Sequence, residues 1–349
     1  MLRTKRRGWL AVLAAALLLG GAAAAWLLTR PHEGEYHVRP VIPGKIYAGG
    51  QPGAADLRAL VARFSLRSVV NLRGPRQDET WYQNELAACR ELSLAHADVR
   101  VKLDDWPPQH EVWRFVDLLN QFRGPVLLHC KNGVDRSGWG AAVARALAGE
   151  PLEAALAELS ATSGHLCVER SCPLHRFFAL YSGWLGGTGE THSGAAFRRW
   201  AREHYCPPPY DALLELLDGA PVQPAAAGQE LRFTVRARNR SSLPWTLSSR
   251  PDRGIRLGAR LIGPLAAHHA DPVALFREHN ELTHDLGRAG LEEGLVPPGD
   301  SRIFSLAFPA PPEPGHYLLQ IDMVDELVHW FSDLGGAGII IQIEVTAGG

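Results

Sequence analysis

The chain has no excess of charge of either sign and contains little cysteine. Its 349 residues include 36 Lys and Arg against 37 Asp and Glu, a formal net charge of −1, and only five cysteines. This balance provides no overall field that would draw the protein to nucleic acid or acidic polymers, so any recognition of charge is local. With 46% hydrophobic and 21% charged residues, the chain is neither disordered nor fibrous, and its length suggests about two domains.

The N-terminus carries a segment typical of membrane insertion. A basic cluster at residues 3–7 precedes an uncharged, mostly apolar run from Trp9 to Thr29. This predicts one transmembrane helix within residues 1–30, with the rest of the chain outside the cytoplasm, in the periplasm. A cleaved signal peptide is the alternative, because residues 20–26 are small enough for a signal peptidase, and the protein would then be secreted. The anchor is favoured because the run exceeds the usual apolar length of a signal.

Residues 31–217 show alternating strand and helix patterns, which predict an α/β domain with a central sheet flanked by helices. Short buried runs mark the strands, and apolar periodicity marks the helices. We expect strands near 46–47, 68–72, 97–101 and 125–130, helices at 56–64, 81–92, 111–122 and 138–147, another helix opened by Pro151, and a short helix ending at Leu217.

A proline-rich stretch at 206–210 and a linker at 218–228 precede a different pattern over residues 229–349. Alternating apolar and polar residues with proline and glycine turns predict an all-β sandwich, which loosely resembles an immunoglobulin-like accessory domain with tryptophans at 245 and 330. One face of its first strand carries arginines, which could serve an anionic surface or a glycan, or could only protect an edge. They are Arg232, Arg236, Arg238 and Arg240.

Residues 125–140, PVLLHCKNGVDRSGWG, place chemically active side chains between a buried strand and a helix. Five residues separate Cys130 from Arg136, so a tight loop can curl around one tetrahedral anion with its backbone N–H groups and the helix N-terminus directed inward. Arg136 offers a planar fork for two oxygens and favours the thiolate of Cys130. Ser137 can donate a hydrogen bond to the sulfur, and we expect His129 to orient the loop.

This stretch resembles the signature of the cysteine-based protein tyrosine and dual-specificity phosphatases, His-Cys-five residues-Arg-Ser/Thr. The segments IYAGGQP and VVNLRG resemble the opening strands of their compact bacterial and atypical dual-specificity branch. The resemblance implies a phosphomonoester hydrolase that forms a phosphocysteine and needs no metal or cofactor. It implies that Cys130, Arg136 and Ser137 act in catalysis and that the remaining loop residues bind substrate, namely His129, Lys131, Asn132, Gly133, Val134 and Asp135.

The resemblance also requires a general acid on a loop upstream of the cysteine. Asp104 and Asp105 precede Trp106 and two prolines at such a place. A carboxylic acid there could protonate the oxygen that leaves the phosphate. The sequence cannot separate the two, and an Asp-rich turn is the alternative.

The substrate class is less determined. Lys131 is typical of lipid-phosphate members of the family, but Asp135 offsets its charge, which favours a simple monoester such as phosphotyrosine or a small envelope-associated phosphate over a multiply phosphorylated inositol. The alternatives are an inert phosphate- or glycan-binding envelope protein, a lipid or small-molecule phosphatase, and a rhodanese-like sulfur transferase. An intact pair of Cys130 and Arg136 favours the enzyme.

The other cysteines receive structural interpretations. Cys89 lies in a predicted helix and is expected to pack in a core. Cys172 could form a disulfide with Cys167 or Cys206 in an oxidising compartment.

Overall fold

The computed structural model describes residues 38–160, 172–218, 220, 222–267, 271–278, 283–290 and 292–347. The predicted N-terminal transmembrane or signal segment, residues 1–30, lies outside these ranges. Within them, no helix is both long enough and apolar enough to span a membrane. The chain divides into two compact units, one of residues 1–103 and 119–172 and one of residues 104–118 and 173–349.

The first unit is an α/β fold around a five-stranded sheet of order β1-β2-β5-β3-β4. Strands β2, β5, β3 and β4 run parallel, and β1 pairs with β2 antiparallel. The predicted class of this unit is therefore confirmed. The strands are β1 (Arg39–Ile42), β2 (Ile46–Gly49), β3 (Ser68–Asn71), β4 (Ala95–Asp98) and β5 (Val126–His129), and the helices are α2 (Ala54–Phe64), α3 (Thr80–Glu91), α5 (Asp135–Leu147) and α6 (Leu152–Ala157).

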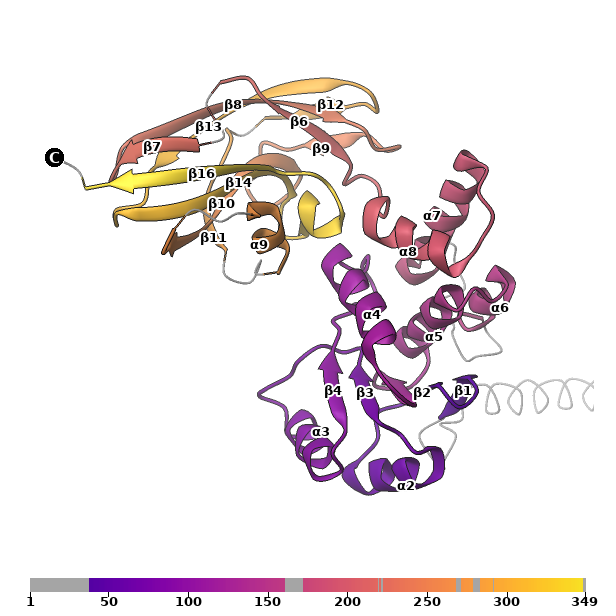
Figure 1. Cartoon of the computed structure of the whole chain (residues 1–349). Coiled ribbons are helices and arrows are strands. Elements are labelled where there is room, and N and C mark those ends of the chain that lie inside the picture. The colour runs from indigo at the N-terminus through magenta and orange to yellow at the C-terminus, as the bar shows by residue number, and fades with distance from the viewer. Residues whose placement is uncertain are drawn as a thin grey trace, which may run out of the picture. The chain divides into compact units, whose positions relative to one another are not determined.

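Helices cover both faces of this sheet (Figure 1). Helices α2 and α3 pack against one face in a core that includes Leu57, Cys89, Val69 and Leu127. Cys89 is a buried packing residue, as expected. All four residues of the central strand β5 are buried, which explains its uninterrupted apolar sequence before His129. Because the neighbouring strands are parallel to β5, their carboxyl ends meet at the edge where the Cys130 loop begins.

The second unit contains a β-sandwich together with several helices. One sheet has the order β11-β10-β14-β16-β7, with β15 on β14; a second has the order β13-β8-β6, and β12 pairs with β9. The strands are β6 (Ala212–Leu216), β7 (Val222–Ala226), β8 (Glu230–Asn239), β9 (Trp245–Leu247), β10 (Ile255–Leu265), β11 (His284–Arg288), β12 (Gly294–Val296), β13 (Ser301–Pro309), β14 (Gly315–Asp325), β15 (His329–Trp330) and β16 (Ile339–Thr346), and the helices include α7 (Pro173–Thr188), α8 (Gly194–Glu203), α9 (Pro272–Glu278) and η4 (Phe331–Leu334).

The boundary predicted between the domains needs correction. The helix expected to end at Leu217 is strand β6, because short apolar runs fit either structure and this one alternates between buried and more exposed residues. The predicted linker 218–228 contains β7, which pairs parallel with β16 at the edge of the sheet. An edge position tolerates Pro224, since proline lacks the N–H that a central strand needs.

Segment 104–118 and helices α7 and α8 also belong to the second unit, rather than to the predicted catalytic domain of residues 31–217. Helix α4 (Gln109–Gln121) begins in this segment. The indole of Trp113 donates to the carbonyl of Ala201 at 2.7 Å, and the side chain of Gln109 donates to the carbonyl of Tyr205 at 3.1 Å. These contacts join residues about ninety positions apart, which local patterns cannot reveal.

The arginine face of β8 is largely balanced by carboxylates. Three of the arginines form ion pairs: Arg232 with Glu230, Arg236 with Glu215, and Arg240, just beyond the strand, with Asp211. Exposed ion pairs contribute little to stability, but they reduce the positive potential of the face. The side chain of the fourth, Arg238, donates to the carbonyl of Gly299 at 3.0 Å.

Candidate active site

The loop of residues 130–134 connects β5 to α5 and places Cys130 at the carboxyl end of the central strand. Cys130 is buried, with 3% of its surface exposed. Gly133 has a φ of 78°, and a Cβ at this position would lie 2.4 Å from the backbone nitrogen of Gly50. Only glycine combines this left-handed conformation with so close an approach, so Gly133 is required for the loop to close against the end of β2.

Arg136 lies in the first turn of α5, six positions after the thiol. Its Nε is buried and forms no hydrogen bond with the described residues. Buried donors are nearly always paired, and a guanidinium is suited to bind two oxygens of an anion. The free backbone N–H groups at the start of a helix favour an anion at the same place. This loop and Arg136 together therefore have the properties of a site for one phosphate group.

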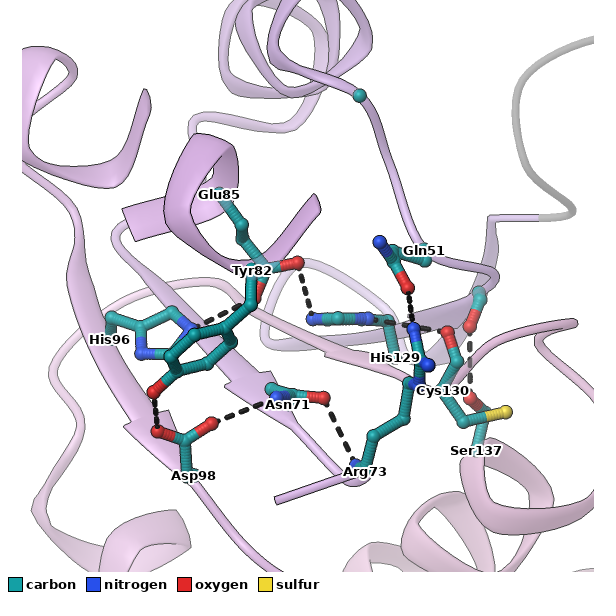
Figure 2. A network of polar contacts seen from close by, with 12 residues as sticks. Gln51, Asn71, Arg73, Tyr82, Glu85, His96, Asp98, His129, Cys130 and Ser137 are labelled. Carbon is teal, nitrogen blue, oxygen red and sulfur yellow. Dashed lines mark hydrogen bonds and ion pairs between the residues drawn. The ribbon is translucent and has the colours of Figure 1, made fainter. Parts of the chain in front are cut away.

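Ser137 has a different contact from the one expected. Its hydroxyl donates to the carbonyl of Gly49 at 2.8 Å, and the side chain is fully buried. A serine hydroxyl has a single proton, so in this arrangement Ser137 connects the loop to β2 and does not donate to the sulfur of Cys130. Figure 2 shows this contact beside Cys130.

His129 is held on both sides. Its Nε2 lies 3.1 Å from Oε2 of Glu85, and its Nδ1 lies 3.3 Å from the carbonyl oxygen of Cys130. The other carboxylate oxygen of Glu85 contacts Nε2 of His96 at 2.8 Å. Burial alone would raise the pKa of Glu85, but the two histidines outweigh it and lower the pKa to about 2. The carboxylate of α3 thus stays charged and fixes the imidazole that precedes the nucleophile.

Glu85 was not identified by sequence reasoning, and neither was Arg73. Both belong to elements that are distant from Cys130 in the chain and adjacent in the fold (Figure 2). The one available signal for Glu85 was a charged residue on the buried face of the amphipathic helix α3. For Arg73 it was a basic residue two positions after the end of β3, at the carboxyl edge of the sheet.

The two candidate acids lie in the second unit, whereas Cys130 lies in the first. Asp105 is half-buried: its Oδ2 lies 2.7 Å from Nε2 of His329, and its Oδ1 accepts the N–H of Trp106 at 2.8 Å. Asp104 is exposed. The structure thus distinguishes the aspartates that the sequence could not separate, since Asp105 connects its segment to β15 and Asp104 has an exposed carboxylate.

The remaining predicted loop residues differ in exposure. Lys131 and Asn132 are exposed, and Val134 and Asp135 are half-buried. The carbonyl of Lys131 accepts the backbone N–H of Gln51 at 3.3 Å. Asp135 lies in the first turn of α5, where a carboxylate stabilises a helix.

The structure bears on one of the two predicted disulfides. Cys206 is a free thiol, so the Cys172–Cys206 pairing was wrong. The alternative pairing involves Cys167, which lies outside the described residues.

Comparisons with known proteins find the following similarities. Residues 42–163 match a family model described as a DSP-PTPase phosphatase fused to NAD+ kinase. Among solved structures, PTPMT1 is 16% identical, with 42% of this chain and 99% of that chain covered and a TM-score of 0.32. The catalytic core of the PP-IP phosphatase Siw14 from S. cerevisiae is 20% identical, with 44% and 92% covered and a TM-score of 0.35.

A putative phosphatase from Neisseria meningitidis is 19% identical, with 37% of this chain and 89% of that chain covered and a TM-score of 0.30. No curated protein sequence matches the chain. The family match spans β2 through the Cys130 loop and α6. By this match and by the residues of its loop, residues 42–163 are similar to the atypical cysteine-based dual-specificity phosphatases, and this similarity supports a phosphatase-like hydrolase.

Proposed function

We propose that the chain hydrolyses phosphomonoesters through a covalent phosphocysteine on Cys130, without a metal. The observation that carries this proposal is the buried Nε of Arg136 at the start of α5, which has no hydrogen-bond partner among the described residues and lies six positions after a buried cysteine. A guanidinium and helix N–H groups around one thiol favour an anion and a thiolate together. An inert binding protein would need the anion site but not the nucleophile.

The reaction has two displacement steps. The thiolate of Cys130 attacks phosphorus, so that an S–P bond forms while the P–O bond to the alcohol breaks, and the departing oxygen takes a proton from a general acid. A water molecule then attacks phosphorus and gives a proton to the carboxylate left by the general acid, while the S–P bond breaks, which releases inorganic phosphate and restores both the thiolate and the acid. Arg136 and the loop N–H groups hold the phosphoryl oxygens in both steps.

The test of this function is turnover of p-nitrophenyl phosphate by the protein with EDTA present. Turnover that persists in EDTA supports cysteine chemistry, whereas activity that requires an added metal ion would contradict it. The physiological substrate is a phosphomonoester, and we propose phosphotyrosine or a small envelope-associated phosphate, with a lipid phosphate as the alternative.

For the general acid we propose Asp104, because Asp105 is held by His329. We expect Asp104→Asn to lower kcat by roughly 10²- to 10⁴-fold for alkyl phosphates, which are poor leaving groups, and much less for p-nitrophenyl phosphate. Asp105→Asn is the matched control, and its effect should not depend on the leaving group. Steady-state kinetics on both substrates measure the difference. Equal, small effects of the two variants would show that this segment is only structural.

We propose that the N-terminal segment anchors the protein with its phosphatase domain in the periplasm. The basic cluster at residues 3–7 precedes the apolar run, and positive charge is retained on the cytoplasmic side. Alkaline phosphatase and β-lactamase fused after residue 35 should both be active, since each works only outside the cytoplasm. Inactive alkaline phosphatase at this junction would disprove the orientation.

For the sandwich we propose an accessory, spacing role. Binding to an anionic surface or a glycan through the β8 arginines is the alternative. The ion pairs of Arg232, Arg236 and Arg240 leave little net charge on that face, which supports the first role.

A further inference from the structure

Arg73 is a guanidinium outside the Cys130 loop that the fold places next to it. Strand β3 pairs parallel with β5, Asn71 opposite His129, and the N–H of Leu72 donates to the carbonyl of His129 at 2.9 Å. Arg73 therefore leaves the sheet beside the point where the loop begins. In Figure 2 its guanidinium lies next to Cys130.

Arg73 is held in this position by two side-chain contacts and one backbone contact. Its guanidinium donates to the side-chain oxygen of Gln51 and stacks over the ring of Trp81 at 3.8 Å, and its backbone N–H donates to Oδ1 of Asn71 at 3.0 Å. Gln51 in turn donates its backbone N–H to the loop at Lys131. Only 14% of the Arg73 side chain is exposed, so its orientation is largely fixed before a ligand binds.

The charge of Arg73 is incompletely compensated. The carboxylate of Glu79 lies 3.7 Å from a terminal nitrogen, which is beyond hydrogen-bond distance. Burial lowers the pKa of Arg73, Glu79 raises it, and the guanidinium of Arg136 lowers it further. Two guanidinium groups that repel each other in a partly buried position favour an anionic ligand that contacts both.

We propose that Arg73 binds a second anionic group of the substrate, next to the phosphoryl group that Arg136 and the loop hold. This rests on the proposed function. The loop and Arg136 provide donors for one tetrahedral anion, and Arg73 approaches from a different strand. Among the phosphomonoesters proposed above, this contact favours small or lipid phosphates that carry a second phosphate group close to the first over phosphotyrosine. Arg73 adds a cation beside Lys131, whose charge Asp135 offsets, and it lies 57 positions before Cys130, so no local sequence pattern indicates it.

Binding of pyrophosphate and of inorganic phosphate to the full chain, measured by calorimetry with EDTA present, tests the proposal. We expect Arg73→Gln to weaken pyrophosphate binding roughly 10- to 100-fold more than phosphate binding, since a charge-assisted contact to the second group is lost. Arg76→Gln is the matched control, because Arg76 lies in the same connection and is exposed, with 54% of its side chain accessible. It removes the same charge and should change the ratio of the two affinities by less than about threefold.

Equal changes in that ratio for Arg73→Gln and Arg76→Gln, or no change for Arg73→Gln, would overturn the proposal. Arg73→Lys keeps the charge and is the variant to use if Arg73→Gln does not fold. We expect it to lose part of the preference for pyrophosphate over phosphate, because lysine lacks the planar fork of arginine. The proposed function fails separately, if wild type does not turn over p-nitrophenyl phosphate. The binding ratio still reports on Arg73 in that case.

Discussion

Cys130→Ser should abolish turnover of p-nitrophenyl phosphate while the protein still binds inorganic phosphate. Removing a catalytic nucleophile lowers kcat by roughly 10⁴- to 10⁶-fold. The serine hydroxyl stays protonated in the absence of a general base, so it cannot replace the thiolate. The binding site for the anion is made by Arg136 and backbone N–H groups, which the substitution leaves in place. Steady-state kinetics and calorimetry with phosphate measure the two properties.

Cys89→Ala is the matched control for this experiment. Cys89 is also a buried thiol of the first unit, and burial raises its pKa to about 12, so it is not a nucleophile near neutral pH. We expect the variant to retain turnover with some loss of stability, because it removes a core side chain. Turnover by Cys130→Ser close to that of wild type would show that the reaction does not proceed through this cysteine.

Glu85→Gln should destabilise the first unit by about 3 kcal/mol near neutral pH. The pKa of Glu85 falls from 4.5 to about 2 on folding, and one pKa unit corresponds to about 1.4 kcal/mol. Breaking a buried ion pair by removing one partner costs a similar amount. We expect lower turnover as well, because His129 loses the carboxylate that fixes it beside Cys130.

The pH dependence of this stabilisation has a defined sign. Because folding lowers the pKa of Glu85, its contribution is complete above the unfolded value of 4.5 and is lost as the pH falls toward 2. Hydrogen exchange of the β5 amides, measured at several pH values, reports the opening free energy of this unit separately from the sandwich. The difference between wild type and Glu85→Gln should shrink as the pH falls below about 4.5.

Glu91→Gln on the same helix is the control for this variant. Glu91 pairs with Arg58 at the surface, where 57% of its side chain is exposed, and solvent screens such pairs. It should leave the exchange of β5 nearly unchanged. A Glu85→Gln protein as stable as wild type at neutral pH would contradict the assignment of Glu85 as the carboxylate that holds His129.

The Cys130 loop could be predicted because its signals are local. A buried apolar strand, a glycine and a helix start follow one another within 16 residues, and Gly133 has the positive φ that the loop requires. Glu85 and Arg73 could not be predicted, since they reach the loop from another helix and another strand of the sheet. The role of Arg73 depends on the parallel pairing of β3 with β5, and that of Glu85 depends on the packing of α3 against the sheet. Sequence periodicity specifies neither.

The domain boundary and the acid could not be read from the sequence for the same reason. Asp105 contacts His329, which is 224 positions later. Segment 104–118 belongs to the same compact unit as residues 173–349, which lie far along the chain. Strands β6 and β7 are short, with five residues each, so their assignment depended on partners in β8 and β16.

The phosphocysteine intermediate is tested most directly by rapid acid quench of the protein during turnover of a phosphomonoester, followed by mass spectrometry of its peptides. We predict that phosphate is attached to the peptide that contains Cys130 and to Cys130 itself, and that Cys130→Ser shows none there. A protein that turns over the substrate while Cys130 remains unmodified, or one phosphorylated at a different residue, would contradict the mechanism.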